Sequence, residues 1–308
     1  MHLGNASSAL LAWLSIRSRG GSFVMRMEDL DRNRVEPGLA GRILDDLAWL
    51  GIDWDEGPDV GGPFAPYEQW VRRERYAAAF ERLKGAGLLY PCFCSRKEIA
   101  AAASAPQSPG DELRYPGTCR GIDPGEALRR VESGARHAWR LRVAAGDRPV
   151  FDDKVRGPWG TDQPLPPGDF VVFRSDGVPA YQLAVVVDDA EMGIDEVVRG
   201  DDLLPSTARQ ILLYRGLGWE PPAFGHVPLL LGTDGVRLSK RHRGTTLREL
   251  REAGLGPEQI VGRLAWTVGL RPGPDPVSAA DLVDGFALEQ VAPAPDGIVV
   301  DPSRWLAS

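Results

Sequence analysis

Segments of helical and of strand-like period alternate along this chain, and this alternation restricts its fold more than any other feature. Residues 6–19 place apolar side chains at helical spacing and stop at Gly20 and Gly21. Residues 22–27 predict a short strand, and residues 39–50 and 67–84 predict helices. Strands and helices in alternation indicate an α/β fold with a parallel sheet.

The α/β pattern is interrupted near Pro91 and resumes after residue 167. The interruption contains every cysteine, a stretch of Ala, Ser, Pro and Gly over 100–110, and a strand-like segment over 138–143. The elements expected after it are strands over 169–174, 196–198 and 226–231, and helices over 203–216, 246–253 and 257–268. We therefore expect four parts: half of an α/β domain (1–90), an inserted unit (91–167), the second half (168–245) and a helical C-terminal segment (246–308).

Composition excludes several classes of protein. The chain has 43% apolar and 26% charged residues, as ordinary globular proteins do. It has no run of about 18 apolar residues and no secretory signal pattern, so we expect a cytoplasmic protein without a membrane partner. We also expect the protein to be a monomer. The net charge of −7 argues against a general nucleic-acid coat. It leaves room for a local basic patch, such as residues 237–243.

The sequence His2-Leu3-Gly4-Asn5 stands immediately before the first predicted helix. Backbone N–H groups and the helix dipole at such a position attract phosphate, and a glycine allows a ribose or base to approach closely. Alone the tetrapeptide is weak evidence, because a histidine beside a first methionine is more often an incidental surface residue. It predicts a nucleotide site only in combination with other motifs.

A second basic motif, Arg237-Leu238-Ser239-Lys240-Arg241, follows the predicted strand over 226–231 and a turn at 233–235. A loop there would place Lys240 on the phosphates of ATP, where a cation stabilises the charge that develops in a transition state. The alternative is a basic exit from a hairpin, and this motif alone does not separate the two.

Together these motifs resemble the HIGH and KMSKS motifs of class I aminoacyl-tRNA synthetases. Residues 26–31 (RMEDLD) resemble the R-x-E-D-x-D of the glutamate-type branch, and residues 181–184 and 198–201 resemble two further blocks of it. The resemblance runs from residue 2 to about residue 270. It implies the Rossmann-like nucleotide-binding fold of class I synthetases, with Mg²⁺ accompanying ATP. By the same resemblance His2 and Lys240 are catalytic, and the ATP-binding residues are His2, Gly4, Asn5, Ser239 and Lys240.

The resemblance also implies a glutamate site at Glu28, Tyr181 and Arg199. Glu28 would neutralise the α-ammonium group, Arg199 can offer a two-nitrogen fork to a carboxylate, and Tyr181 would add a hydroxyl donor. The alternatives are a surface acid, a structural ion pair and a core tyrosine. Asp188 and Asp189 are expected to have structural roles near the site.

The three cysteines, Cys92, Cys94 and Cys119, are too few and odd in number for a disulfide framework. Three thiolates are good zinc ligands, and a structural site needs a fourth. By chemistry alone the nearest candidate is His137. The glutamyl-queuosine tRNA(Asp) synthetases, which the chain resembles most closely, use C-x-C followed by Y-x-x-x-C, which implies Tyr115 as the fourth ligand of one structural Zn²⁺. The alternative is three free, buried thiols.

Members of that short family activate L-glutamate with ATP and esterify it to queuosine in the anticodon of tRNA(Asp). A full glutamyl-tRNA synthetase carries a large helical anticodon-binding region after its KMSKS loop, and only residues 241–308 follow Lys240 here. The resemblance therefore favours the short family. The alternatives are a catalytic fragment of a glutamyl-tRNA synthetase, or an inactive paralogue that binds tRNA or zinc.

One feature departs from the family. Its members begin with a strand and a turn of the type R-x-A-P-S-P-T-G directly before the HIGH motif, and these 308 residues do not contain it. We expect that Met1 is an internal methionine taken as the start, and that the first strand of the sheet is missing. A sheet that lacks an interior strand exposes the edges of its neighbours.

Overall fold

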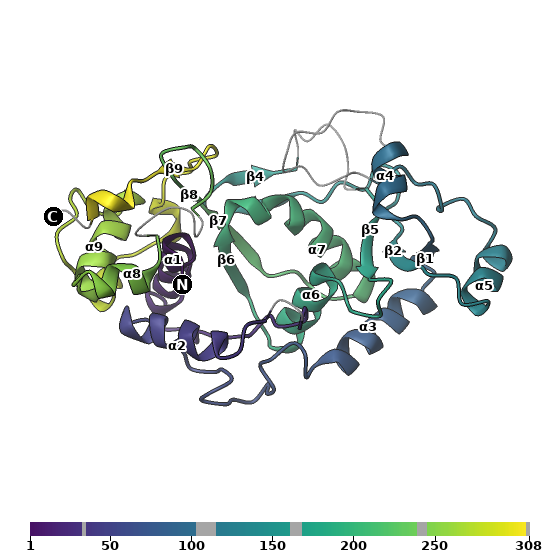
Figure 1. The fold of residues 1–308 in the computed structure, drawn as a ribbon, viewed down its shortest axis with the longest axis horizontal. Coiled ribbons are helices and arrows are strands. Elements are labelled where there is room, and N and C mark those ends of the chain that lie inside the picture. The colour runs from purple at the N-terminus through teal and green to yellow at the C-terminus, as the bar shows by residue number, and fades with distance from the viewer. Residues whose placement is uncertain (33–34, 103–114, 161–167, 239–244, 306–308) are drawn as a thin grey trace.

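The computed structural model describes residues 1–32, 35–102, 115–160, 168–238 and 245–305. The protein is elongated, and a central α/β region lies between a helical end and a smaller sheet with its own helices (Figure 1). Among the described residues, no helix has the length and apolar character that crossing a bilayer requires.

The central sheet has the strand order β4-β3-β7-β6. Its strands are β3 (Phe151–Asp153), β4 (Gly157–Trp159), β6 (Glu196–Gly200) and β7 (Ala223–Val227). Both β3 and β6 run parallel to β7, while β4 is antiparallel to β3. Helix α1 (Leu3–Arg17) lies against β6, while α6 (Tyr181–Glu191) and α7 (Leu204–Leu217) pack on each other. The expected α/β fold with parallel pairing is confirmed.

A second, antiparallel sheet has the order β1-β2-β5. It consists of β1 (Leu89–Cys92), β2 (Ala138–Leu141) and β5 (Phe170–Phe173), accompanied by α3 (Arg73–Gly85), α4 (Arg96–Ala102) and α5 (Pro124–Glu132). Strands β3 and β4 fall within the predicted insertion at 91–167, yet they pair in the central sheet. The described chain therefore leaves the small sheet after β2 and returns to it at β5.

Three predicted elements differ in the structure. Residues 22–27 form two isolated bridges, Val24 with Glu56 and Met27 with Glu68, because their partners lie in loops. The predicted helix over 67–84 begins only at Arg73, because the backbones of Tyr67 and Gln69 form hydrogen bonds with the backbone of Met27 instead. The predicted strand over 226–231 divides at Pro228, which has no N–H to donate, and β8 (Leu230–Leu231) pairs instead with β9 (Ile298–Val299).

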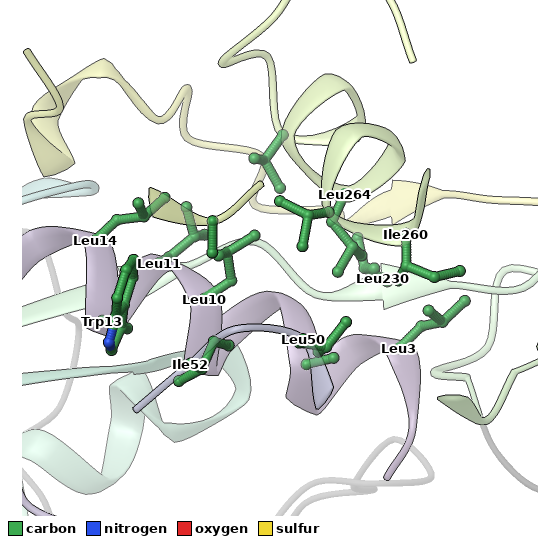
Figure 2. Packing of buried hydrophobic residues seen from close by; sticks show 14 of the residues in the cluster. Leu3, Leu10, Leu11, Trp13, Leu14, Leu50, Ile52, Leu230, Ile260 and Leu264 are labelled. Atoms are coloured by element: carbon green, nitrogen blue, oxygen red, sulfur yellow. The ribbon is translucent and has the colours of Figure 1, made fainter. Parts of the chain in front are cut away.

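The helical end forms around the apolar face of α1. It contains α2 (Leu39–Trp49), α8 (Leu247–Glu252), α9 (Pro257–Thr267) and the 3-10 segments Ala280–Leu282, Leu288–Gln290 and Pro302–Trp305. Figure 2 shows Leu10 and Leu14 of α1 in one cluster with Leu230, Ile260 and Leu264. Burial of these side chains fixes α1 against the C-terminal helices, and this sets where the N-terminus of α1 points.

Candidate active site

A cleft of about 1350 Å³ opens between α1, the segment 21–28, α6 and β6. Six residues nominated from the sequence line it: His2, Gly4, Asn5, Glu28, Tyr181 and Arg199. These residues come from both halves of the predicted α/β domain. Ser239 and Lys240 lie outside the described residues, although Arg237 and Leu238 line the same cleft.

The N-terminus of α1 forms part of the cleft wall. The Leu3 N–H donates to the carbonyl of Thr245 at 2.8 Å, and the Leu247 N–H donates to the carbonyl of Met1 at 2.9 Å. Among the described residues, the backbone N–H groups of Gly4 and Asn5 have no acceptor. A Cβ added at Gly4 would meet nothing within 4 Å, so the helix start has open space for a ligand. This arrangement suits a phosphate or the sugar attached to it.

Glu28 lines the same cleft and lies in a group of charges. Arg26 donates to Asp189 at 2.7 Å through Nη1 and to Glu28 at 3.1 Å through Nη2. Burial alone would lower the pKa of Arg26, but the carboxylates of Asp189, Glu28 and Asp188 raise it. Arg26 therefore remains a cation, and it holds two carboxylates at the cleft wall.

Asp189 contributes to the cleft wall beyond the structural role expected for it. Burial raises the pKa of its carboxyl group, and Arg26 opposes that shift. Tyr181, Val185 and Asp189 all line the cleft from α6. Their i, i+4, i+8 spacing is the sequence signal that could have identified Asp189 once residue 181 was known to begin a helix.

Asp188, the preceding residue, faces the protein interior. Its carboxylate accepts hydrogen bonds from Arg72 at 2.6 Å, from Gln69 at 2.9 Å and from the hydroxyl of Tyr76. Asp188 is fully buried, and the Arg72 side chain is 1% exposed. This ion pair joins the segment before α3 to α6, which agrees with the structural role expected for Asp188.

Tyr181 is the first residue of α6 and lies on the same wall as Asp189. Partial burial in the cleft, together with the nearby charge of Glu28, raises its pKa to about 12. The phenol therefore stays protonated at neutral pH and can donate a hydrogen bond to an anionic ligand.

Arg199 extends from β6 toward α7. Its guanidinium donates to His226 at 3.1 Å, to Thr207 at 2.7 Å and to Gln210 at 2.7 Å. Burial lowers its pKa. Sequence reasoning nominated Arg199 but none of these partners, which come from a neighbouring strand and a helix.

The cysteines converge as predicted. The Sγ atoms of Cys92, Cys94 and Cys119 all lie within 4.8 Å of one another. The Tyr115 hydroxyl lies 3.3 Å from Cys92 Sγ and 3.8 Å from Cys94 Sγ. His137 is not a member of this cluster; its Nδ1 bonds the carbonyl of Ala135 and its ring packs edge-on against Trp139.

Comparisons with known proteins agree with this arrangement. Residues 1–272 match the family described as tRNA synthetases class I (E and Q), catalytic domain. The chain is 53% identical to a glutamyl-Q tRNA(Asp) synthetase of Symbiobacterium thermophilum over 96% of its own length and 91% of that relative's. The chain belongs to the glutamyl-Q tRNA(Asp) synthetase family. A second member, from Nitratidesulfovibrio vulgaris, is 48% identical over 99% of the chain and 93% of the relative.

Longer proteins are more distantly related to this glutamyl-Q synthetase family member. A glutamate–tRNA ligase of Halorhodospira halophila is 41% identical, and the match covers 99% of the chain but 64% of that ligase. The crystal structure of glutamate-tRNA synthetase from Elizabethkingia anophelis superposes with a TM-score of 0.83 at 28% identity, covering 99% of this chain and 67% of that one. The α/β class I synthetase fold is therefore confirmed.

We predict that Asp188→Asn lowers the free energy of unfolding by about 3 kcal/mol, because it leaves the buried Arg72 without its main counter-charge while Glu191 still pairs with it. The control is Asp53→Asn, which removes the charge of an Arg17 partner whose side chain is 74% exposed and should cost at most about 1 kcal/mol. Urea unfolding of both variants measures the difference. Equal losses would contradict a structural role for the buried pair.

Proposed function

We propose that this protein activates L-glutamate with ATP and transfers the glutamyl group to queuosine in the anticodon of tRNA(Asp). The observation that carries the proposal is that the residues nominated for ATP and those nominated for glutamate line one cleft. Its lining includes both the open start of α1 and the group of Glu28, Tyr181 and Arg199. The names of the relatives from Symbiobacterium thermophilum and Nitratidesulfovibrio vulgaris support the same reaction. We further propose that the protein is cytoplasmic and monomeric.

The first step is attack of a glutamate α-carboxylate oxygen on the α-phosphorus of ATP. The bond from that phosphorus to the bridging oxygen breaks, and pyrophosphate leaves together with the Mg²⁺ that ATP brings as its substrate complex. The N–H groups of Gly4 and Asn5 and the side chains of His2 and Lys240 would stabilise the negative charge. Positioning and electrostatics supply most of the catalysis in such a step.

Glutamate would be held by charges of both signs. Its ammonium group would meet Glu28, with Asp189 beside it, while a carboxylate would accept hydrogen bonds from Tyr181 and Arg199. In the second step, a hydroxyl of the queuosine cyclopentenediol attacks the carbonyl carbon of the glutamyl-adenylate, and AMP leaves. The proton of that hydroxyl passes to the departing phosphate or to solvent.

Charging assays test this function. We expect glutamate to be esterified to tRNA(Asp) that contains queuosine, and not to the same tRNA with guanosine or to tRNA(Glu). With the R-x-A-P-S-P-T-G strand supplied, glutamate-dependent exchange of pyrophosphate into ATP should proceed without RNA, and Lys240→Ala should slow it by roughly two orders of magnitude. Charging of tRNA(Glu) would favour the glutamate–tRNA ligase alternative, and no exchange with any tRNA would favour an inactive paralogue.

We also propose that Cys92, Cys94, Tyr115 and Cys119 hold one structural Zn²⁺ in the small-sheet unit. A tetrahedral ion with Zn–S bonds of about 2.3 Å places its sulfur ligands about 3.8 Å apart. The separation of Cys94 and Cys119 Sγ atoms, 3.5 Å, is close to that geometry. The chemistry of the donors, three soft sulfurs and a phenol oxygen with no basic side chain among them, favours zinc over a hard cation.

Metal analysis tests the zinc proposal. Protein purified without chelator should contain about one zinc per chain. The Cys119→Ser variant should lose most of this zinc, and its small sheet should melt at a lower temperature. The neighbouring Thr118→Ser serves as the matched control and should retain the metal. Tyr115→Phe should weaken zinc binding and His137→Gln should not; the reverse order would make His137 the fourth ligand.

Finally, we propose that an extended strand of the R-x-A-P-S-P-T-G type pairs with β6. Strand β6 ends the central sheet and, among the described strands, pairs only with β7. The cleft runs along its other side, between residues 195–200 and 21–26. An unpaired edge facing a cleft of this size can accept a further strand.

A synthetic peptide of that sequence type tests the strand. Added in excess to the 308-residue chain, it should slow amide hydrogen exchange at residues 196–200 and raise the melting temperature. A peptide of the same composition in scrambled order is the control. Unchanged exchange at β6, with the cleft still accepting ATP, would rule out strand pairing at this edge.

A further inference from the structure

A buried hydrogen-bond network surrounds Arg199 and ends at Asp153, a residue to which the proposed function assigns no role. Asp153 ends β3, His226 lies in β7 and Arg199 lies opposite His226 in β6. His226 and the Asp153 side chain are fully buried. The network therefore crosses three adjacent strands inside the protein.

The donors in this network allow only one tautomer of His226. Asp153 Oδ1 already accepts the backbone N–H groups of Val155, Arg156 and His226 at 2.8 to 3.1 Å. Its Oδ2 lies 2.6 Å from His226 Nδ1. Since a carboxylate only accepts, the proton of the imidazole must lie on Nδ1.

The opposite nitrogen of the ring must then act as an acceptor. His226 Nε2 lies 3.1 Å from Arg199 Nε, which always carries a hydrogen, and 3.0 Å from the hydroxyl of Thr207. A proton on Nε2 would point at the N–H of Arg199. The neutral Nδ1–H form is the only one that satisfies Asp153 and Arg199 at the same time.

The network uses three of the five N–H groups of Arg199. Nε donates to His226, and both hydrogens of Nη2 are used, one by Thr207 and one by Gln210. Gln210 is fixed in turn, because its amide nitrogen donates to Gln182 at 2.9 Å. No described residue accepts a hydrogen bond from Nη1. Both remaining N–H groups are therefore on Nη1, and Arg199 lines the cleft.

We propose that Asp153 and His226 are positioning residues for substrate recognition: they hold Nε of Arg199, while Thr207 and Gln210 hold Nη2, so that only Nη1 is left to bind a carboxylate of the amino acid. This inference rests on the proposed glutamate site. It replaces the two-nitrogen fork expected from the sequence with a single-nitrogen contact. Tyr181 would then supply the donor for the second carboxylate oxygen.

Asp153→Asn tests the inference by reversing the tautomer without changing the shape of the side chain. The asparagine oxygen must still accept the three backbone N–H groups, so its NH₂ group faces His226 and forces the proton onto Nε2. An Asp→Asn change beside a catalytic histidine in serine proteases has this effect. We expect the KM for glutamate in pyrophosphate exchange to rise roughly 10- to 100-fold, as for loss of a hydrogen bond to a charged group. The KM for ATP should stay within about threefold and kcat should change much less than the glutamate KM.

The control is to make the Asp153→Asn change a second time in a variant that already carries His226→Gln. A glutamine oxygen can replace Nε2 as the acceptor for Arg199, so this variant should retain much of the glutamate affinity. Asp153→Asn added to it should change the glutamate KM little further, because no ring remains whose tautomer can reverse. Equal effects of Asp153→Asn in both backgrounds would mean that Asp153 acts only on folding, and would overturn the proposal.

Two measurements on the unaltered protein are independent of variant folding. Long-range ¹H–¹⁵N spectra, assigned with His226→Gln, should show the Nδ1–H tautomer of His226 at pH 7.5; the Nε2–H tautomer or an imidazolium would overturn the proposal. The glutamate KM should rise as the pH falls below about 6.5, the ordinary pKa of histidine, and this rise should be absent in His226→Gln.

The expected sign of the pH effect follows from the groups that face His226. Burial and the charge of Arg199 lower its pKa, and the carboxylates of Asp153 and Asp201 oppose that shift without cancelling it. The ring is therefore neutral above its pKa, and its protonation at lower pH removes the acceptor for Arg199. If unaltered protein shows no glutamate-dependent exchange at all, the proposed function has failed; if it is active and Asp153→Asn leaves the glutamate KM unchanged, only this inference has failed.

Discussion

The cleft depends on a short antiparallel contact between the first residues of the chain and a segment more than two hundred residues later. The backbone of Met1 and Leu3 bonds Leu247 and Thr245, and Thr246 caps α8 at the same point. Because α1 is also held by the apolar cluster with α9 and Leu230, its start cannot turn away from the cleft. The position of every N–H group that would meet a phosphate follows from these contacts.

The sequence predicted those parts of the site that local patterns encode. His2, Glu28, Tyr181 and Arg199 belong to short sequence motifs, and all four line the cleft. Asp153 could not be predicted in the same way, because its importance arises from the pairing of β3 with β7, which no local pattern specifies. The strand predicted over residues 22–27 is absent for a similar reason: a strand also requires a neighbouring strand, and the described partners of these residues, Glu56 and Glu68, lie in loops.

Electrostatic balance in the cleft is local even though the chain as a whole is acidic. Arg26 lies between Asp189 and Glu28, and Arg199 is held largely by the neutral groups of His226, Thr207 and Gln210. The charge of Arg199 is thus largely uncompensated by its immediate partners, whereas the pair of carboxylates is half compensated by Arg26. An amino acid with two carboxylates and one ammonium group complements that distribution better than a neutral amino acid does.

Helix α6 belongs to two structures at once. Its residues Leu183–Val187 pack with Leu141 of β2 and Val172 of β5 in the core of the small sheet, while Tyr181 and Asp189 form a wall of the cleft. The small sheet therefore cannot be excised as a separate unit: a fragment ending at residue 167 would lack β5, which pairs with β2, and the helix α6 that packs against β5. Grafting the small sheet onto another synthetase would carry part of the cleft wall with it. The small sheet and the cleft would therefore have to be exchanged together.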